Sequence, residues 1–297
     1  MSLALSVVII TLNEERNLGR TLESVKPLVE NDKGEIIVVD SGSTDRTVEI
    51  AKSFGAKVFV EEWKGFAAQK NSAIEKAEGE WVLSLDADEE VSSELAAEVA
   101  ELPSVWNFWN RQEFPTSDDA LAIEMRKKGL RYFLNYPNVV GFYVKRQNLF
   151  LGRWVRQGGY WPDCKLRVFR RGAAQFEERV VHENAKLLSP KQLAFTLDHP
   201  LIHHAYPTLQ IYLEHMRRYA DLGAEMIKDK PRWWLWLNRW LNPPLTFFYN
   251  YVIRLGFLDR REGFLLHWNH RRYVGWKYAK ALELSHSPRS RGAAEND

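Results

Sequence analysis

The chain is poor in cysteine and lacks a long apolar run. Its 297 residues include one cysteine, Cys164, which excludes an internal disulfide and a thiolate zinc cluster and indicates a reducing compartment. The longest run without charge or histidine, residues 240–253, is interrupted by Pro243 and Pro244. It falls short of the roughly 20 apolar residues that a spanning helix needs, so we expect no transmembrane helix.

Targeting and repetitive sequences are also missing. No basic leader or small-residue cleavage site follows Met1, so we expect no secretory signal peptide. There is no internal repeat and no low-complexity tract. With 45% hydrophobic and 27% charged residues, the composition excludes a disordered or fibrous protein and leaves room for one large or two small domains.

Two common phosphate-binding motifs are absent. Residues 11–16, which follow the first apolar run, contain no glycine, so they cannot form the G-x-G-x-x-G turn of dinucleotide-binding folds. A G-x-x-x-x-G-K-[ST] loop does not occur either. A bound diphosphate would therefore need a metal ion on carboxylates and a basic side chain. Lys70 is a candidate for that charge, although an isolated lysine is more often solvated.

Short apolar runs alternate with amphipathic segments over the first hundred residues. The runs predict buried strands at residues 5–11, 35–39, 58–60 and 81–85. The segments between them predict helices at residues 14–25, 44–54 and 65–77, the second one capped by Ser43 or Thr44. This order predicts an α/β fold with a mostly parallel central sheet and right-handed crossovers.

Polar side chains follow three of these strands at their carboxyl ends, where parallel sheets bind ligands. They are Thr11, Asn13 and Glu14 after the first strand, Asp40 after the second, and Asp86 and Asp88 after the fourth. Three acids at one edge repel each other unless a cation or a donor-rich ligand lies among them. We therefore interpret Asp40, Asp86 and Asp88 as a ligand site rather than as helix caps.

Several motifs, in this order, resemble a known family. VVIITLNEE at residues 7–15, VVDSGSTD at 38–45 and LDADE at 85–89 resemble the family 2 inverting glycosyltransferases of the GT-A fold. Other motifs are similar to the lipopolysaccharide-core β-1,4-glucosyltransferase-like subgroup: WKGF at 63–66 with QKN at 69–71, NLFLGR at 148–153, GYWPD at 159–163 and VHE at 181–183. The resemblance covers about residues 5–102 and 140–205.

The resemblance implies a nucleotide-sugar site and a metal site. Nucleotide-sugar contacts are implied for Thr11, Asn13, Glu14, Asp40, Lys70 and Asp86. Asp40 would accept a hydrogen bond from the base, and Asp86 would lie near the ribose. Mg²⁺ or Mn²⁺ would be held by the D-x-D pair, Asp88 and Asp86, with His182 as a further ligand. The alternative for His182 is a structural histidine.

The resemblance also implies a catalytic base that deprotonates the acceptor hydroxyl. Asp163 is the first candidate and Glu183 the second. The alternative for Asp163 is a helix cap after Pro162. Arg167, Arg170 and Arg171 would offer charge to phosphates or to an anionic acceptor, although a solvated basic turn is the preferred interpretation. We treat Cys164 as a bystander.

One segment departs from the family pattern, and the end of the chain has a composition of its own. Residues 103–139, with a predicted helix at 120–134, have no counterpart in the pattern. Residues 201–297 contain 15 Lys/Arg against 9 Asp/Glu and half of the 12 tryptophans. After a helix predicted at 209–227, this mixture is typical of helices that lie on an anionic membrane. The alternatives are aromatics packed on the catalytic domain and, ranked last, a single-stranded nucleic-acid site.

Together these patterns predict a GT-A catalytic domain at residues 1–207, a membrane-associating helical region at 208–285 and a disordered tail at 286–297. The expected reaction is inverting transfer of a hexose, glucose in the first instance, from a UDP-sugar to a lipid-linked saccharide of the lipopolysaccharide core or cell envelope. We expect a peripheral protein on the cytoplasmic face of the membrane that binds no nucleic acid. The alternatives are transfer to a polyisoprenyl phosphate and a non-catalytic adaptor that retains the fold.

Overall fold

The computed structural model describes residues 4–31, 33–110, 138–177 and 184–285, with only the backbone of 103–110. The chain divides into two compact units. The sheet unit comprises residues 1–146, 163–179 and 183–203, and the helical unit comprises residues 147–162, 180–182 and 204–297. The helix predicted at 120–134 and the tail predicted at 286–297 lie outside the described residues.

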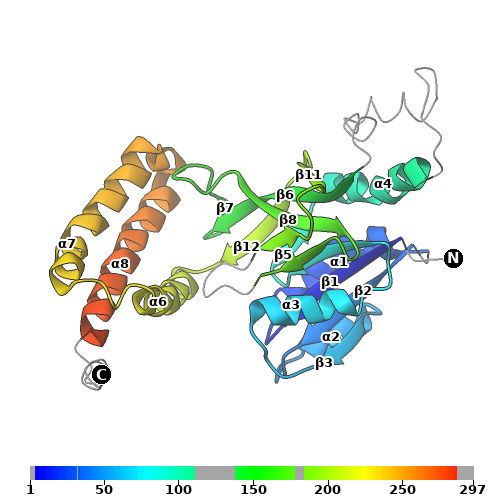
Figure 1. Ribbon diagram of the computed structural model, residues 1–297, viewed down its shortest axis with the longest axis horizontal. Helices are drawn as coiled ribbons and strands as arrows, with labels where there is room; N and C mark the ends of the chain where they lie inside the picture. The colour runs from blue at the N-terminus through cyan, green and yellow to red at the C-terminus, as the bar shows by residue number, and fades with distance from the viewer. Residues whose placement is uncertain (1–3, 32, 111–137, 178–183, 286–297) are drawn as a thin grey trace, which may run out of the picture. The chain divides into compact units, whose positions relative to one another are not determined.

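The first half of the sheet is parallel, and the predicted α/β class is confirmed (Figure 1). Its strands pair in the order β3-β2-β1-β4: β1 (Leu5–Thr11), β2 (Gly34–Asp40), β3 (Lys57–Val60) and β4 (Trp81–Asp86). The intervening helices are α1 (Leu18–Val29), α2 (Thr47–Ser53) and α3 (Phe66–Glu75). Each predicted strand and helix of this region is present.

Beyond β4 the sheet becomes largely antiparallel. It continues through β8 (Asp163–Arg170), β6 (Val139–Phe150), β12 (Leu201–Tyr206) and β5 (Glu89–Val91). Two further strands pair with β6, namely β7 (Arg153–Trp154) and β11 (Leu193–Thr196). The remaining elements of the sheet unit are helix α4 (Ser93–Asn110) and a small antiparallel pair, β9 (Ala174–Phe176) and β10 (Ala185–Leu187).

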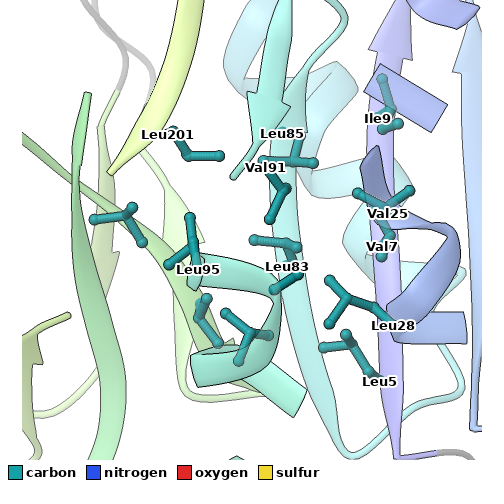
Figure 2. Packing of buried hydrophobic residues seen from close by; sticks show 14 of the residues in the cluster. Leu5, Val7, Ile9, Val25, Leu28, Leu83, Leu85, Val91, Leu95 and Leu201 are labelled. Carbon is teal, nitrogen blue, oxygen red and sulfur yellow. The ribbon is translucent and has the colours of Figure 1, made fainter. Parts of the chain in front are cut away.

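The core explains why β1 is an almost unbroken apolar run. Leu5, Val7 and Ile9 point to one face of the sheet and pack with residues of β4, α1 and α4 (Figure 2). Val8 points to the other face, where it packs in the cluster that includes residues of α3. Since each buried aliphatic side chain contributes about 1.5–3 kcal/mol, both faces must be apolar for this central strand to be stable.

A polar network closes the amino-terminal edge of the same strands. Ser6, the one polar residue within the apolar part of β1, donates to Glu35 Oε1 at 2.6 Å and accepts from the Gly79 amide at 2.8 Å. Lys57 Nζ lies 2.8 Å from Glu35 Oε2. Burial raises the pKa of Glu35, but the bonds from Lys57 and Ser6 outweigh it and lower the pKa below its usual value. The network joins β1, β2 and β3 to the turn before β4.

The helical unit contains three long helices, which are α6 (Leu209–Glu225), α7 (Arg232–Phe248) and α8 (Arg260–Leu284). A π-helical turn, η2 (Tyr249–Ile253), and a 3₁₀ turn, η3 (Gly256–Asp259), connect α7 to α8. The helix predicted at 209–227 is therefore confirmed as α6, which Thr208 caps by accepting from the Ile211 amide. Among the described residues, none of the helices has the length and hydrophobicity that crossing a bilayer requires.

A buried carboxylate in η3 fixes a loop of this unit. Asp259 Oδ2 accepts from the amides of Arg156 and Gln157 at 3.1 and 2.7 Å. The Gly158 amide donates to the Arg254 carbonyl at 2.9 Å. Gly158 has a positive φ of 67°, which favours glycine, so its identity follows from this tight loop.

We predict that Gly79→Ala destabilises the sheet unit by about 1–3 kcal/mol, because overpacking against rigid atoms has that cost. The added Cβ would lie 2.6 Å from the Ser6 backbone nitrogen, which cannot move without disturbing β1. Urea unfolding measures the change. The matched control is Gly19→Ala in α1, where the nearest atom, on Ile50, is 3.8 Å away. This control is expected to be neutral or stabilising, and equal stability of both variants would refute the argument.

Candidate functional site

The loops that follow β1 and β2 are bonded to each other and form one rim. The Asn13 amide donates to Ser43 Oγ at 2.8 Å, and Asn13 Oδ1 accepts from the Thr44 amide at 2.9 Å. The Glu14 amide donates to Thr47 Oγ1 at 2.8 Å. The predicted capping of α2 by Ser43 or Thr44 is therefore wrong. The helix begins only at Thr47, and the two side chains are used between the loops.

Asp40 lies at the base of this rim, and its carboxylate is turned into its own loop. It accepts from Thr11 Oγ1 at 2.9 Å and from the amides of Gly42 and Ser43 at 3.0 and 2.8 Å. The Ser43 hydroxyl donates to it as well. Asp40 therefore orders the turn after β2, and a bond to a nucleobase would share oxygens that are already hydrogen-bonded.

Glu14 lies close enough to the D-x-D pair to interact with it electrostatically. Burial raises the pKa of Glu14, and the charges of Asp88, Asp45 and Asp86 raise it further, against a hydrogen bond from Asn17 that lowers it. Glu14, after β1, is thus within electrostatic range of Asp86 and Asp88, after β4.

Behind this edge lies an ion cluster, which consists of Lys70, Asp86, Glu89, Arg146, Asp163 and Arg167. Lys70 Nζ lies 2.7 Å from Asp86 Oδ1, and Arg167 Nη2 lies 2.6 Å from Asp86 Oδ2. Arg167 also pairs with Glu89 at 2.5 Å. The side chains of Lys70 and Arg167 are only 4% exposed, and Glu89 is fully buried.

This burial corrects two interpretations. Lys70 is not a solvated lysine, and Arg167 does not lie in a solvated turn but inside β8. Burial raises the pKa of Asp86, but Arg167, Lys70 and Arg146 together lower it well below its usual value. Asp86 is therefore ionised, and both of its oxygens already contact cations. The geometry assigns it to this cluster and does not support its predicted part as a metal ligand.

Asp88, the second acid of the D-x-D pair, has a different partner. Its Oδ2 lies 3.3 Å from His203 Nε2, and the two side chains are 27% and 15% exposed, so both are accessible from solvent. Burial lowers the pKa of His203, but the Asp88 carboxylate raises it by more, to above its ordinary value. The carboxylate oxygen suits Mg²⁺ or Mn²⁺, whereas the adjacent imidazole nitrogen is a softer donor that favours Mn²⁺ over Mg²⁺.

The other predicted metal ligand, His182, and the second candidate base, Glu183, lie outside the described residues. Across the described part of the chain, no group of three or more His, Cys, Asp or Glu side chains is arranged to hold a metal ion. Asp88 and His203 would therefore need oxygen ligands from a substrate to complete a metal site, as phosphates do for Mg²⁺ in many enzymes.

Asp163 is the first residue of β8, so its alternative interpretation as a helix cap is wrong. It faces Arg146 across the antiparallel pairing of β8 with β6. Arg146 donates to Asp163 Oδ2 through Nε at 2.9 Å and through Nη2 at 2.6 Å. Lys165 Nζ lies 3.7 Å from Oδ1. Because two donors grip one oxygen, the orientation of this carboxylate is fixed.

Three members of this site, Glu89, Arg146 and His203, are not among the residues that the sequence predicts. Glu89 directly follows the D-x-D motif and lies in a buried segment. An acid in such a place needs a charged partner, and this could have indicated its part in the cluster. Arg146 and His203 come from β6 and β12, far along the chain, and only the strand pairing brings them to Asp163 and Asp88.

Comparisons with known proteins find similarity mainly in the first third of the chain. Residues 6–102 match the model of the family described as Glycosyl transferase family 2. Uncharacterized glycosyltransferase RT0209 of Rickettsia typhi is 48% identical over 95 residues, which are 32% of this chain and 31% of that protein. The lipopolysaccharide core biosynthesis glycosyltransferase LpsC of Rhizobium meliloti is 30% identical over 192 residues, 61% of this chain and 56% of the relative.

Among solved structures, one match is the mannosyltransferase PcManGT of Pyrobaculum calidifontis, in complex with GDP-Man and Mn²⁺. It is 17% identical with a TM-score of 0.47, over 95% of this chain and 75% of that one. The chain spans about a third of the length of the first curated relatives that it matches. The family match is confined to residues 6–102, from β1 into α4, and these residues resemble a family 2 glycosyltransferase domain.

We predict that Glu89→Gln destabilises the protein by about 3–5 kcal/mol, because it leaves Arg167 and Arg146 with too little compensating charge in a buried place. Urea unfolding of the full chain measures this change. The matched control is Glu23→Gln on α1, whose carboxylate is 62% exposed and pairs with Lys26 at the surface. The control should stay close to wild type, and a similar loss in both variants would contradict the role of the cluster.

Proposed function

We propose that the chain transfers a hexose from a UDP-sugar, with inversion, to a hydroxyl of a lipid-linked saccharide in the lipopolysaccharide core or another cell-envelope glycan. One observation carries the proposal. Asp163 and Asp86, from β8 and β4, are joined through Arg146, Glu89 and Arg167 at a sheet edge formed in part by residues that match family 2. The choice of glucose and UDP follows the motif resemblance, and the choice of acceptor follows the resemblance and the relative LpsC, a lipopolysaccharide core biosynthesis glycosyltransferase.

The rim formed by the loops after β1 and β2 would bind the nucleoside. Thr11, Asn13 and Glu14 line that rim, and Asp40 holds its shape. Lys70 and Arg167 place two fixed positive charges beside Asp86, where the diphosphate would approach. Fixed charges of this kind stabilise negative charge as it develops, without reorganisation during the reaction.

Asp88 and His203 would hold the divalent cation, in place of the predicted set of Asp88, Asp86 and His182. When bound, Mg²⁺ or Mn²⁺ supplies charge that stabilises the leaving diphosphate. Asp86 would keep the other end of the D-x-D turn in position, because Lys70 and Arg167 hold both of its oxygens.

Asp163 would be the catalytic base. Its carboxylate would take the proton of the acceptor hydroxyl while that oxygen forms a bond to the anomeric carbon. The bond from that carbon to the diphosphate oxygen breaks, and its electron pair leaves with UDP, so the configuration inverts. Arg146 would fix the direction in which the carboxylate presents itself.

We predict that Asp163→Asn lowers the transfer rate by about 10²–10⁴-fold, because an amide cannot accept the proton and general-base assistance contributes about that much. UDP release from a UDP-sugar and an acceptor measures the rate, and calorimetry should show unchanged UDP affinity. The control Asp198→Asn removes an exposed carboxylate outside the cluster and should leave the rate unchanged. Wild-type turnover in Asp163→Asn together with a large loss in Glu183→Gln would transfer the role to Glu183.

For the metal, we predict that His203→Ala weakens Mn²⁺ binding in the presence of UDP by at least about tenfold, since loss of even an outer-shell partner costs about 10–100-fold. Isothermal titration calorimetry measures the affinity. His199→Ala is the matched control, because His199 is an exposed histidine near β12 that pairs with Glu98. A loss in His182→Ala but not in His203→Ala would restore the original assignment.

A screen of donors and acceptors tests the substrate class. UDP-glucose and its epimers are offered with Mn²⁺ to a core oligosaccharide and to a polyisoprenyl phosphate. Transfer to the saccharide supports the proposal, and transfer to the lipid phosphate alone replaces its acceptor. Absence of both transfer and metal-dependent donor hydrolysis would leave a non-catalytic protein that retains the fold.

A further inference from the structure

The helical unit has an exposed apolar face on α7. Its stripe consists of Trp233, Trp236, Leu237, Trp240, Leu241 and Phe248, each at least 40% exposed. Most of these residues are spaced three or four apart, so they follow one side of the helix. Single exposed apolar residues are ordinary on soluble proteins, but a contiguous row of this length marks an interaction site.

The helical unit does not use this stripe to pack α7 against its other helices. The opposite side of α7 already packs against α8, where Leu235 is fully buried and Asn242 donates to the Tyr278 hydroxyl at 2.7 Å. Figure 1 shows the two helices side by side along their length. The fold of the helical unit is therefore satisfied without the stripe.

The exposed apolar surface continues past α7. In η3, Phe257 and Leu258 are 44% and 52% exposed although they belong to a turn that is anchored through Asp259. A turn held in this way presents apolar side chains to solvent from a fixed backbone. The exposed apolar surface of α7 thus continues over η3.

The charges around this face are almost all positive. Residues 231–261 contain five arginines and one acid. The acid is Asp259, which is buried and bonded to the Arg156 and Gln157 amides, so it does not offset the arginines at the surface. The arginines are exposed, and they are Arg232, Arg239, Arg254, Arg260 and Arg261.

Exposed tryptophans beside exposed arginines indicate that the partner of this face is a lipid surface. Tryptophan is favoured where one end of a side chain is apolar and the other wet, as at the boundary of lipid tails and headgroups. Arginine forms bidentate bonds with phosphate. We infer that α7 and η3 bind flat on the surface of an anionic membrane, with the stripe among the acyl chains and the arginines on the phosphates.

The inference deepens the proposed function, and rests on it for the statement that the acceptor is lipid-linked. Membrane binding would keep the enzyme at the surface that contains its acceptor. The lipid contact itself can be measured without sugar transfer, so the two proposals can fail separately.

The test is co-sedimentation of the full chain with vesicles of phosphatidylcholine alone or mixed with phosphatidylglycerol. Wild type should bind the mixed vesicles, with a blue shift of tryptophan emission and a loss of binding as salt rises. Trp236→Ser with Trp240→Ser should reduce partitioning by about tenfold or more, since two large apolar side chains no longer enter the lipid. Arg232→Gln with Arg239→Gln should reduce the preference for anionic vesicles roughly fivefold per arginine.

Met226→Ser is the matched control, because Met226 is 64% exposed in the same unit but lies just after α6 and not on the stripe. It should bind vesicles like wild type, and urea unfolding should show that all variants fold. Failure of wild type to bind either vesicle, or equal binding by the tryptophan variant, would overturn the inference. So would a dimer in solution that the tryptophan substitutions dissociate, since a second copy would then cover the stripe.

Two further measurements separate this inference from the proposed function. Asp163→Asn should bind vesicles as wild type does, whatever its transfer rate. The tryptophan variant should retain transfer to a water-soluble saccharide while losing its advantage on a vesicle-bound acceptor. Vesicle binding without any transfer would refute the proposed function alone.

Discussion

The pairing of buried opposite charges at the junction of the parallel and antiparallel halves of the sheet is the constraint on which the site depends. Asp86 ends β4, Arg167 lies within the adjacent β8, and Lys70 reaches Asp86 from α3. A buried ion pair adds little stability by itself, but removing one partner is costly. The sheet can therefore pack only with these three elements in register, and that register also carries Asp163 and Asp88 to the same edge.

The same pairing gives different surroundings to aspartates that the sequence alone does not distinguish. Asp86 has a cation on each oxygen, so it stays charged and immobile. Asp88, two residues later, contacts an imidazole and remains partly open to solvent. Asp163 is gripped through one oxygen by Arg146. Environment, rather than residue type, separates a structural acid from acids that are suited to a metal ion or a proton.

The sequence predicts the features that neighbouring residues determine, but not the contacts between residues that lie far apart in the chain. The bounds of β1 agree with the predicted 5–11 because a strand buried on both faces is a continuous apolar run. Helix starts were predicted too early, since α1 begins at Leu18 and α2 at Thr47. The residues before these helices form hydrogen bonds between the two loops, from Asn13 to Ser43 and from Glu14 to Thr47. The helical periodicity of a sequence cannot predict such bonds, because they join residues far apart in the chain. His203 and Arg146 were missed for the same reason, at longer range.

The helical unit shows what composition alone leaves undecided. Its tryptophans could equally have formed a core or an outer face, because both interpretations need the same residues. The direction of each side chain decides between them. Trp234 lies 5.8 Å from the Tyr278 ring and belongs to the packing with α8, whereas its neighbours Trp233 and Trp236 are 69% and 59% exposed. Adjacent tryptophans on one helix thus have different surroundings: helical geometry places Trp234 in the packing with α8, and Trp233 and Trp236 on the outer face of α7.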